Sequence, residues 1–138
     1  MPARDLVHDA VCQALIKDGW TITDDPLYIL VDDVRLSIDL GAERILGASK
    51  SGQTIAVEIK SFLGNSDLFA YHLALGQFLN YRLALKRTNP DRTLYLAISQ
   101  DIYEEFFIKS FIQDSIAEYS IKLIIIDLVS QDIVLWKE

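Results

Sequence analysis

The chain has 138 residues, of which 51% are hydrophobic and 24% charged, and its formal net charge at pH 7 is −7. These values predict one globular domain over residues 1–138 and exclude a disordered chain. The acidic net charge disfavours nucleic-acid binding through bulk electrostatic attraction. The single cysteine, Cys12, excludes an internal disulfide and any cysteine-based zinc site.

The sequence also predicts where the protein resides. Its longest apolar runs, such as IKLIIIDLV, are far shorter than the roughly 20 residues of a membrane-spanning helix. The opening residues, MPARDLVHD, carry charges where a signal peptide would have its apolar segment. We therefore expect a cytoplasmic protein without a membrane span or signal peptide.

The first half of the chain predicts one helix followed by short strands. Residues 4–20 have apolar side chains at helical spacing, and Gly19 is suited to end that helix. LYILVDDVRLSID reads as two short strands around a turn at Asp32 and Asp33. RLSIDLGAERILGAS and TIAVEIKSF flank KSGQ, where Gly52 can adopt the positive φ that a hairpin favours.

The second half alternates helices and strands. A helix from about residue 66 to 87 precedes the buried strand TLYLAIS, and IYEEFFIKSFIQDSIAEY is helical. IKLIIIDL and DIVLWK close the chain as strands. The order is a helix, a meander of strands, then helix, strand, helix and two strands. It predicts an α/β sandwich built on a mixed sheet.

The segment AVEIKSF places two opposite charges in an apolar strand. Glu58 and Lys60 are two residues apart and therefore share one face of the strand. A simple interpretation is an ion pair on an exposed strand, which contributes only about 0–1 kcal/mol. However, the predicted hairpin brings the strand that carries Asp39 beside Glu58, and two converging carboxylates repel each other. A bound Mg²⁺ resolves this conflict because it takes oxygen ligands, and Lys60 can then polarise water and offset phosphate charge.

An aspartate followed on the next strand by Glu-x-Lys resembles the PD-(D/E)XK nuclease superfamily, and the predicted element order matches its core. This resemblance implies a restriction-endonuclease-like fold in which Asp39 and Glu58 bind Mg²⁺ or Mn²⁺. Lys60 would assist the hydrolysis of a phosphodiester. Gln77 and Tyr81 look like the Gln-x-x-x-Tyr motif of the RecB-like branch, and their spacing sets both on one helical face.

The sequence departs from the superfamily at two positions. Ile38 stands where a proline usually precedes the first acid. Many members carry a glutamate on the first helix that completes the metal site, and the matching position here is His8. Histidine suits Mn²⁺ or proton transfer better than it suits Mg²⁺. The alternative is that His8 is a residue of the helix surface. The acidic pairs in TITDDP and VDDV are expected to be solvated turn residues.

A basic stretch offers a surface for DNA. No acidic residue occurs from Leu68 to Pro90, whereas Arg82, Lys86 and Arg87 all lie within this segment. We predict that DNA meets the site along this helix through these three cations. The alternative is an ordinary solvated helix face.

The strings DGW, IDLGAER, AVEIKSF, ALGQFLNYR and LYLAIS resemble the XisH family, which are excision-controlling factors of the fdxN element in heterocyst-forming cyanobacteria. This resemblance implies a role in programmed DNA excision, in which a separate site-specific recombinase cuts and rejoins the DNA. It also implies a companion, XisI. Two functions follow: a metal-dependent deoxyribonuclease, or a catalytically inactive accessory protein that binds an XisI-like companion. EEFFIKSF is one candidate contact surface, although a core helix is its more ordinary role.

Overall fold

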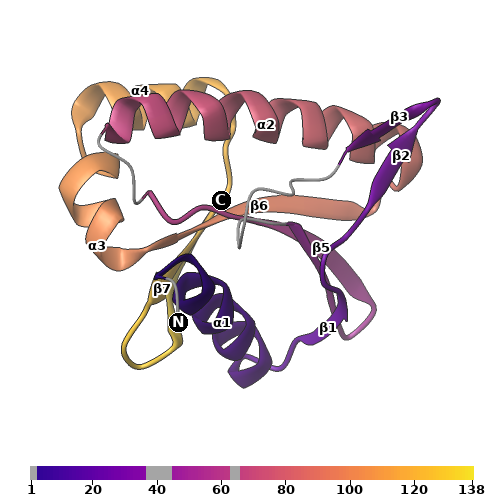
Figure 1. The fold of residues 1–138 in the computed structure, drawn as a ribbon, viewed down its shortest axis with the longest axis horizontal. Helices are drawn as coiled ribbons and strands as arrows, with labels where there is room; N and C mark the ends of the chain where they lie inside the picture. Colours follow the sequence, from indigo (N-terminus) through magenta and orange to yellow (C-terminus); the bar gives the residue numbers. More distant parts are fainter. Residues whose placement is uncertain (1–2, 37–44, 63–65) are drawn as a thin grey trace.

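The computed structural model describes residues 3–36, 45–62 and 66–138. A six-stranded mixed sheet lies at the centre, and helices cover both of its faces (Figure 1). In spatial order its strands are β1 (Thr21–Asp24), β4 (Ile45–Lys50), β5 (Gln53–Ile59), β6 (Arg92–Ser99), β7 (Leu123–Asp127) and β8 (Asp132–Lys137). β5, β6 and β7 run parallel to one another, and the other neighbours are antiparallel. The predicted α/β architecture with a mixed sheet is therefore confirmed.

The first helix, α1 (Ala3–Lys17), ends as the sequence predicts. Gly19 has a φ of 94°, and its N–H donates to the carbonyl of Ile16 at 3.0 Å. The N–H of Trp20 donates to the carbonyl of Leu15 at 2.9 Å. These two bonds form a Schellman motif, which satisfies carbonyl groups that the end of a helix leaves unpaired.

The hairpin between β4 and β5 also follows from local sequence. Ser51 and Gly52 have φ values of 51° and 81°, as a two-residue turn with positive φ at both positions requires. The resulting register pairs Lys50 with Gln53 at the turn, and Ile45 with Glu58 at the far end. The turn thereby determines which residue lies beside Glu58.

Two features of the first half differ from the prediction. β1 is a four-residue strand that was not predicted from the sequence, and it pairs with β4 at the edge of the sheet. β2 (Ile29–Val31) and β3 (Val34–Leu36) do form around Asp32, but they make a separate two-stranded ribbon instead of continuing the main sheet. Strands this short carry too little periodicity to show which partner they pair with.

Each face of the sheet has its own hydrophobic core. One core contains α1 together with Val57 and Ile59 of β5. The other contains α2 (Asp67–Thr88) together with Ala56. Because side chains alternate along a strand, Glu58 shares the face of Ala56 and points toward α2.

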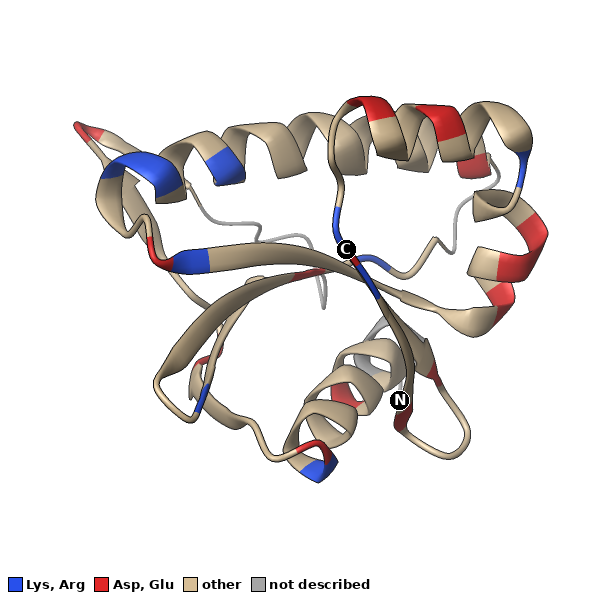
Figure 2. Ribbon diagram, turned by 180° about the vertical axis from the view of Figure 1, so that it is seen from behind, with Lys and Arg blue, Asp and Glu red and all other residues tan. Residues whose placement is uncertain are grey.

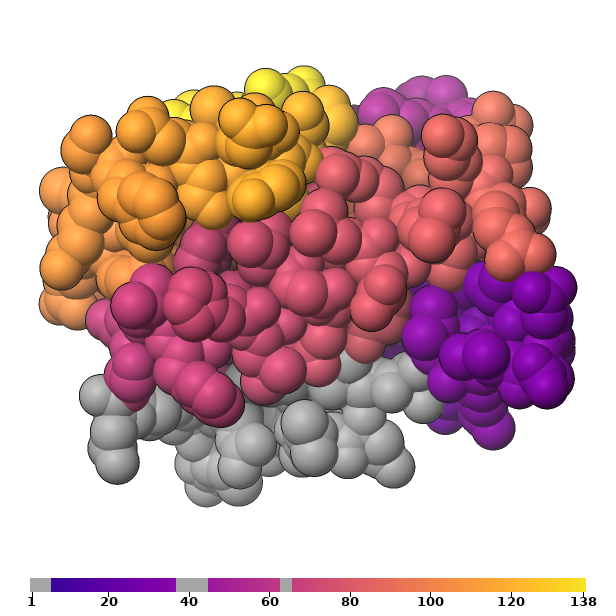
Figure 3. Space-filling view, turned by 90° about the horizontal axis from the view of Figure 1, so that it is seen from above, coloured from indigo at the N-terminus to yellow at the C-terminus, as the bar shows by residue number. Residues whose placement is uncertain are grey.

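The last helical region is broken where the sequence predicts one continuous helix. It consists of α3 (Gln100–Ile102), the π-helical segment η1 (Tyr103–Phe107) and α4 (Ser110–Glu118). α4 lies beside α2 on the outer side of the fold (Figures 1 and 3). The hydroxyl groups of Tyr71 and Ser115 connect the two helices at 2.7 Å. No helix in the described parts of the chain is long and apolar enough to span a membrane.

Candidate functional site

Glu58 lies near the end of β5 and Lys60 directly follows this strand, and both are deep inside the protein. The exposed fractions of Glu58 and Lys60 are 0% and 5%. The N–H of Lys60 donates to the carbonyl of Ala97 at 3.2 Å, so the backbone stays against β6 at this point. The strand is therefore not exposed here, contrary to what the interpretation as a surface ion pair requires. Removing an ion from water costs several kcal/mol, so a buried acid and base mark a candidate functional site.

Tyr81 of α2 lies close enough to Glu58 for the two groups to interact electrostatically. Burial raises the pKa of the Tyr81 hydroxyl above its usual range, and the negative charge of Glu58 raises that pKa further. The phenol therefore stays neutral at physiological pH and keeps a proton to donate. The structure thus brings together two site residues that the sequence predicts on separate elements.

Gln77 lies one turn before Tyr81 on α2, and this spacing sets both residues on the same side of the helix. The side-chain oxygen of Gln77 is buried and has no hydrogen-bond partner among the described residues. A buried amide oxygen without a partner is costly to the fold. It is also a hard oxygen donor of the kind that Mg²⁺ and Mn²⁺ accept.

Asp39, the first acid of the predicted metal site, lies outside the described residues. It precedes Ile45 along the chain, and Ile45 is the residue that pairs with Glu58. The oxygen donors of Glu58 and Gln77 and the nearby cation Lys60 fit a hard divalent cation, and the site that includes Asp39 stays a prediction.

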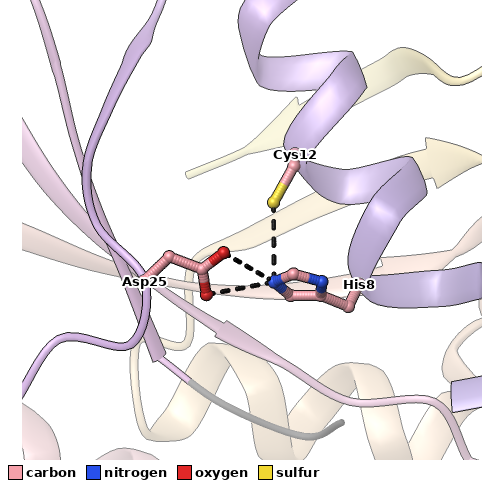
Figure 4. Close-up of side chains that lie close together, drawn as sticks. All are labelled: His8, Cys12 and Asp25. Carbon is pink, nitrogen blue, oxygen red and sulfur yellow. Dashed lines mark hydrogen bonds and ion pairs between the residues drawn. The ribbon is translucent and has the colours of Figure 1, made fainter. Parts of the chain in front are cut away.

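His8 contacts a different set of residues. Its Nε2 lies 3.1 and 3.0 Å from the two carboxylate oxygens of Asp25, and 3.6 Å from the sulfur of Cys12 (Figure 4). Its Nδ1 lies 3.3 Å from Oδ1 of Asp9. α1 packs on the opposite face of the sheet from α2 (Figure 1). The structure thus shows no contact between His8 and the described residues around Glu58. His8 is half-buried, whereas Asp25 is exposed, as expected for a turn residue, and contacts His8.

The predicted DNA-binding cations are partly engaged within the protein. Nη1 of Arg82 donates to the carbonyls of Tyr119 and Ser120 at 2.7 and 3.1 Å. Nη2 of Arg87 lies 3.1 Å from both carboxylate oxygens of Asp32. Lys86 is exposed to solvent. Arg82 and Arg87 therefore support tertiary structure, whatever else they bind.

A pocket of about 310 Å³ lies at the C-terminal end of α2, where Lys and Arg gather in Figure 2. Four cations line it: Arg82, Lys86, Arg92 and Lys122. None of the described residues that line it is acidic. A cleft lined by one sign of charge concentrates ions of the opposite sign. Arg92 lies just beyond the acid-free stretch of the sequence, whereas sequence reasoning missed Lys122 because it comes from a distant segment of the chain.

Comparison with known proteins gives the family. The sequence matches the family described as "XisH protein" over residues 1–134. The chain belongs to the XisH family. The structure is similar to that of an XisH family protein from Nostoc punctiforme PCC 73102, with 44% identity and a TM-score of 0.90. That alignment covers 97% of this chain and 100% of the Nostoc chain.

A second relative carries a more specific description. It is an fdxN element excision controlling factor protein from Anabaena variabilis, with 44% identity and a TM-score of 0.89. The alignment covers 97% of this chain and 99% of that one. No curated protein matches the chain. The predicted membership of the XisH family is confirmed, and the resemblance to the PD-(D/E)XK superfamily stays a prediction.

Proposed function

We propose that this XisH-family chain acts in the excision of an fdxN-type DNA element as a metal-dependent phosphodiester-hydrolysing domain. The observation that carries the proposal is the burial of Glu58, near the end of β5 and within the electrostatic reach of Tyr81, and of Lys60, which directly follows this strand. The order α1, β1, β4, β5, α2, β6, with the β2–β3 ribbon inserted, supports it as well. So does the description of the Anabaena relative.

In this proposal each residue has a distinct role. Asp39 and Glu58 hold Mg²⁺ or Mn²⁺, which when bound polarises a phosphoryl oxygen as a Lewis acid. The Lys60 ammonium offsets phosphate charge and orients water, and it acts strongly because the site excludes solvent. Tyr81 donates a hydrogen bond from its hydroxyl, and Gln77 positions groups on the same side of α2. His8 is left out of this set because its contacts are with Asp25 and Cys12.

DNA binding in this proposal is local rather than a property of the whole surface. A net charge of −7 repels phosphates at long range. Contacts with DNA therefore depend on the pocket at the C-terminal end of α2, which Lys86 and three other cations line. Phosphate contacts of this kind make affinity fall with rising salt, by an amount that grows with the number of phosphates neutralised. A shallow salt dependence is therefore expected.

Calorimetry and a cleavage assay test the proposal. Titration of Mn²⁺ into the wild-type chain should release or absorb heat that Glu58→Ala abolishes. Lys60→Ala should lose the Mn²⁺-dependent nicking of supercoiled or branched DNA, whereas Lys109→Ala on the exposed surface should retain it. A cooperative thermal unfolding transition above the assay temperature shows that each variant is folded in the assay. Identical Mn²⁺ heats for wild type and Glu58→Ala would count against the metal site. A wild-type chain that never nicks DNA would count against catalysis.

A second candidate function is supported by a specific surface. Within EEFFIKSF, Phe106 and Phe107 are buried, as the core-helix alternative predicts, but Ile108 and Phe111 are exposed. Leu68 and Phe69 of α2 are also exposed. Leu68 and Phe111 each lie one turn before the Tyr71–Ser115 contact that joins α2 to α4. We define Leu68, Phe69, Ile108 and Phe111 as the α2–α4 apolar surface.

This surface suits an accessory protein that binds an XisI-like companion and acts on a separate recombinase indirectly. Exposed apolar side chains gathered on adjacent elements are typical of protein interaction sites. Co-expression with an XisI-like protein followed by size-exclusion chromatography should give a stable complex in wild type, and Phe111→Asp should weaken it. A chain that elutes only as a free monomer in the presence of the companion would contradict this function.

A further inference from the structure

His8, Cys12 and Asp25 form a cluster of three potential metal ligands on the α1 side of the sheet (Figure 4). One ligand atom from each residue lies within 4.8 Å of the other two. The donors are an imidazole nitrogen, a thiol sulfur and a carboxylate oxygen. Neither the XisH family description nor the function proposed above assigns a role to this cluster.

The fold creates the cluster from two elements. His8 and Cys12 are four residues apart on α1, so they lie one above the other on the same side of the helix. Asp25 directly follows β1, which is held at the sheet edge by its pairing with β4. Because α1 packs across this part of the sheet, Asp25 reaches the side of α1 that carries the other two ligands.

The two distances to Nε2 of His8 are close to those of a tetrahedral zinc site, and the sulfur of Cys12 lies within 4.8 Å of a carboxylate oxygen of Asp25. Zinc bonds of about 2.3 Å to sulfur and about 2.0–2.1 Å to nitrogen or oxygen place a sulfur and a nitrogen about 3.6 Å apart, and a nitrogen and an oxygen about 3.3 Å apart. In the structure, Sγ of Cys12 lies 3.6 Å from Nε2 of His8. The nearer oxygen of Asp25 lies 3.0 Å from the same nitrogen. A small outward shift of the carboxylate is enough to admit the ion.

The orientation of His8 supplies independent support. Oδ1 of Asp9 lies 3.3 Å from Nδ1, on the opposite side of the ring from Cys12 and Asp25. A carboxylate behind a histidine is a recurrent feature of metal centres, because it holds the proton on the outer nitrogen and directs the inner one at the metal. The His8–Asp25 ion pair accounts for the 3.0 Å contact, and the four-residue spacing on α1 brings the Cys12 thiol to the same nitrogen.

We propose that His8, Cys12 and Asp25 bind a divalent transition metal of the zinc class. The mixed nitrogen, sulfur and oxygen donors favour Zn²⁺ or Co²⁺, whereas Mg²⁺ and Mn²⁺ prefer the oxygen donors around Glu58. When the ion binds, the Nε2 and thiol protons pass to solvent. Three protein ligands leave one coordination position for water or a further ligand. A single cysteine excludes zinc sites that need several cysteine ligands, whereas the proposed site needs only Cys12.

Cobalt spectroscopy tests this site directly. Co²⁺ added to the full chain after chelator treatment should produce the near-ultraviolet charge-transfer band of a thiolate–cobalt bond, and this band should saturate at one thiolate-bound Co²⁺ per chain, whatever Co²⁺ the oxygen donors around Glu58 also take. Zn²⁺ should abolish the band stoichiometrically, and excess Mn²⁺ should not. The Cys12→Ala variant should lose the band. Asp9→Asn should weaken Co²⁺ binding by about tenfold to hundredfold, as expected for an orienting carboxylate.

Matched control variants distinguish the removal of a metal-binding side chain from a failure of the protein to fold. Asp25→Asn should weaken Co²⁺ binding, whereas Asp114→Asn on the exposed side of α4 should leave it unchanged. Circular dichroism identifies any variant that fails to fold. If Asp25→Asn or Asp9→Asn fails to fold, the Cys12→Ala variant, which changes the side chain least, decides whether the site binds Co²⁺. A wild-type chain without the band, or Cys12→Ala binding Co²⁺ as tightly as wild type, would overturn the proposal. Neither result bears on the Mn²⁺ heat at Glu58, so the two sites are tested separately.

Discussion

The Tyr81 hydroxyl on α2 lies in the field of the Glu58 carboxylate on β5, and that negative charge adds to burial in raising the pKa of the phenol. Glu58 is fully buried, so its charge acts through the protein interior, where screening by water is weak. This relationship connects the strand that carries the Glu-x-Lys motif with the helix that carries the Gln-x-x-x-Tyr motif. It also has a measurable consequence for stability at alkaline pH.

The raised pKa of Tyr81 predicts a loss of stability at high pH. A phenol whose pKa is higher in the folded than in the unfolded state contributes stability that is complete below about pH 10 and is lost as the pH rises toward the folded value. Tyr81→Phe should therefore make the free energy of unfolding fall less steeply above about pH 10. Urea denaturation at several alkaline pH values measures this slope.

Tyr95 provides the comparison for that experiment. Burial raises the pKa of its hydroxyl, and the hydrogen bond to Glu138 and the charge of that carboxylate raise it further. Tyr95→Phe should flatten the alkaline slope in the same direction, by a mechanism that does not involve Glu58. If Tyr81→Phe leaves the slope unchanged while Tyr95→Phe reduces it, the proposed interaction between Tyr81 and Glu58 is wrong.

Removal of the buried carboxylate at position 58 should be strongly destabilising. Glu58→Ala leaves the buried Lys60 ammonium with less compensating charge, and removing one partner of a buried charged group typically costs about 3–5 kcal/mol. The control Glu105→Ala removes an exposed carboxylate and should change the free energy of unfolding by less than about 0.5 kcal/mol. Chemical denaturation measures both. Equal effects of the two substitutions would show that Glu58 is not electrostatically important to the fold.

Two glycine substitutions should change the stability of the fold in opposite directions. Gly19→Ala places a side chain at a φ of 94°, and its Cβ would lie 3.1 Å from Cε of Lys50. A left-handed conformation costs a non-glycine residue roughly 1–2 kcal/mol, so this variant should be less stable. Gly76→Ala adds a methyl group in open space on α2 and should stabilise the helix by about 0.5–1 kcal/mol. Thermal denaturation compares them, and a stabilised Gly19→Ala would contradict the role of the Schellman motif.

The two sides of the EEFFIKSF segment should respond differently to truncation. Phe107 is fully buried and makes edge contacts with the rings of Phe62 and Tyr71, so Phe107→Ala should cost about 3–5 kcal/mol. Phe111 is 70% exposed, and Phe111→Ala should change stability by less than about 0.5 kcal/mol. Denaturant titration measures both values. A large loss from Phe111→Ala would place this residue in the core rather than on the α2–α4 apolar surface.

The sequence by itself determined the features that depend on a few neighbouring residues. Gly19 ends α1 because only the local backbone decides whether a positive φ is allowed there. Ser51 and Gly52 determine the hairpin for the same reason, and the two-residue period of a strand places Glu58 on the face of Ala56. These conclusions needed no knowledge of what packs against each element.

Only the tertiary structure decided how deep those residues lie and which residues from other elements they meet. Glu58 is buried because α2 covers its side of the sheet, and no local pattern distinguishes a covered strand from an exposed one. Cys12 and His8 could be read from the helical spacing of α1, but Asp25 joins them only because the short strand β1 pairs with β4. Contacts between distant segments depend on the packing of whole elements, and single-residue preferences do not encode them.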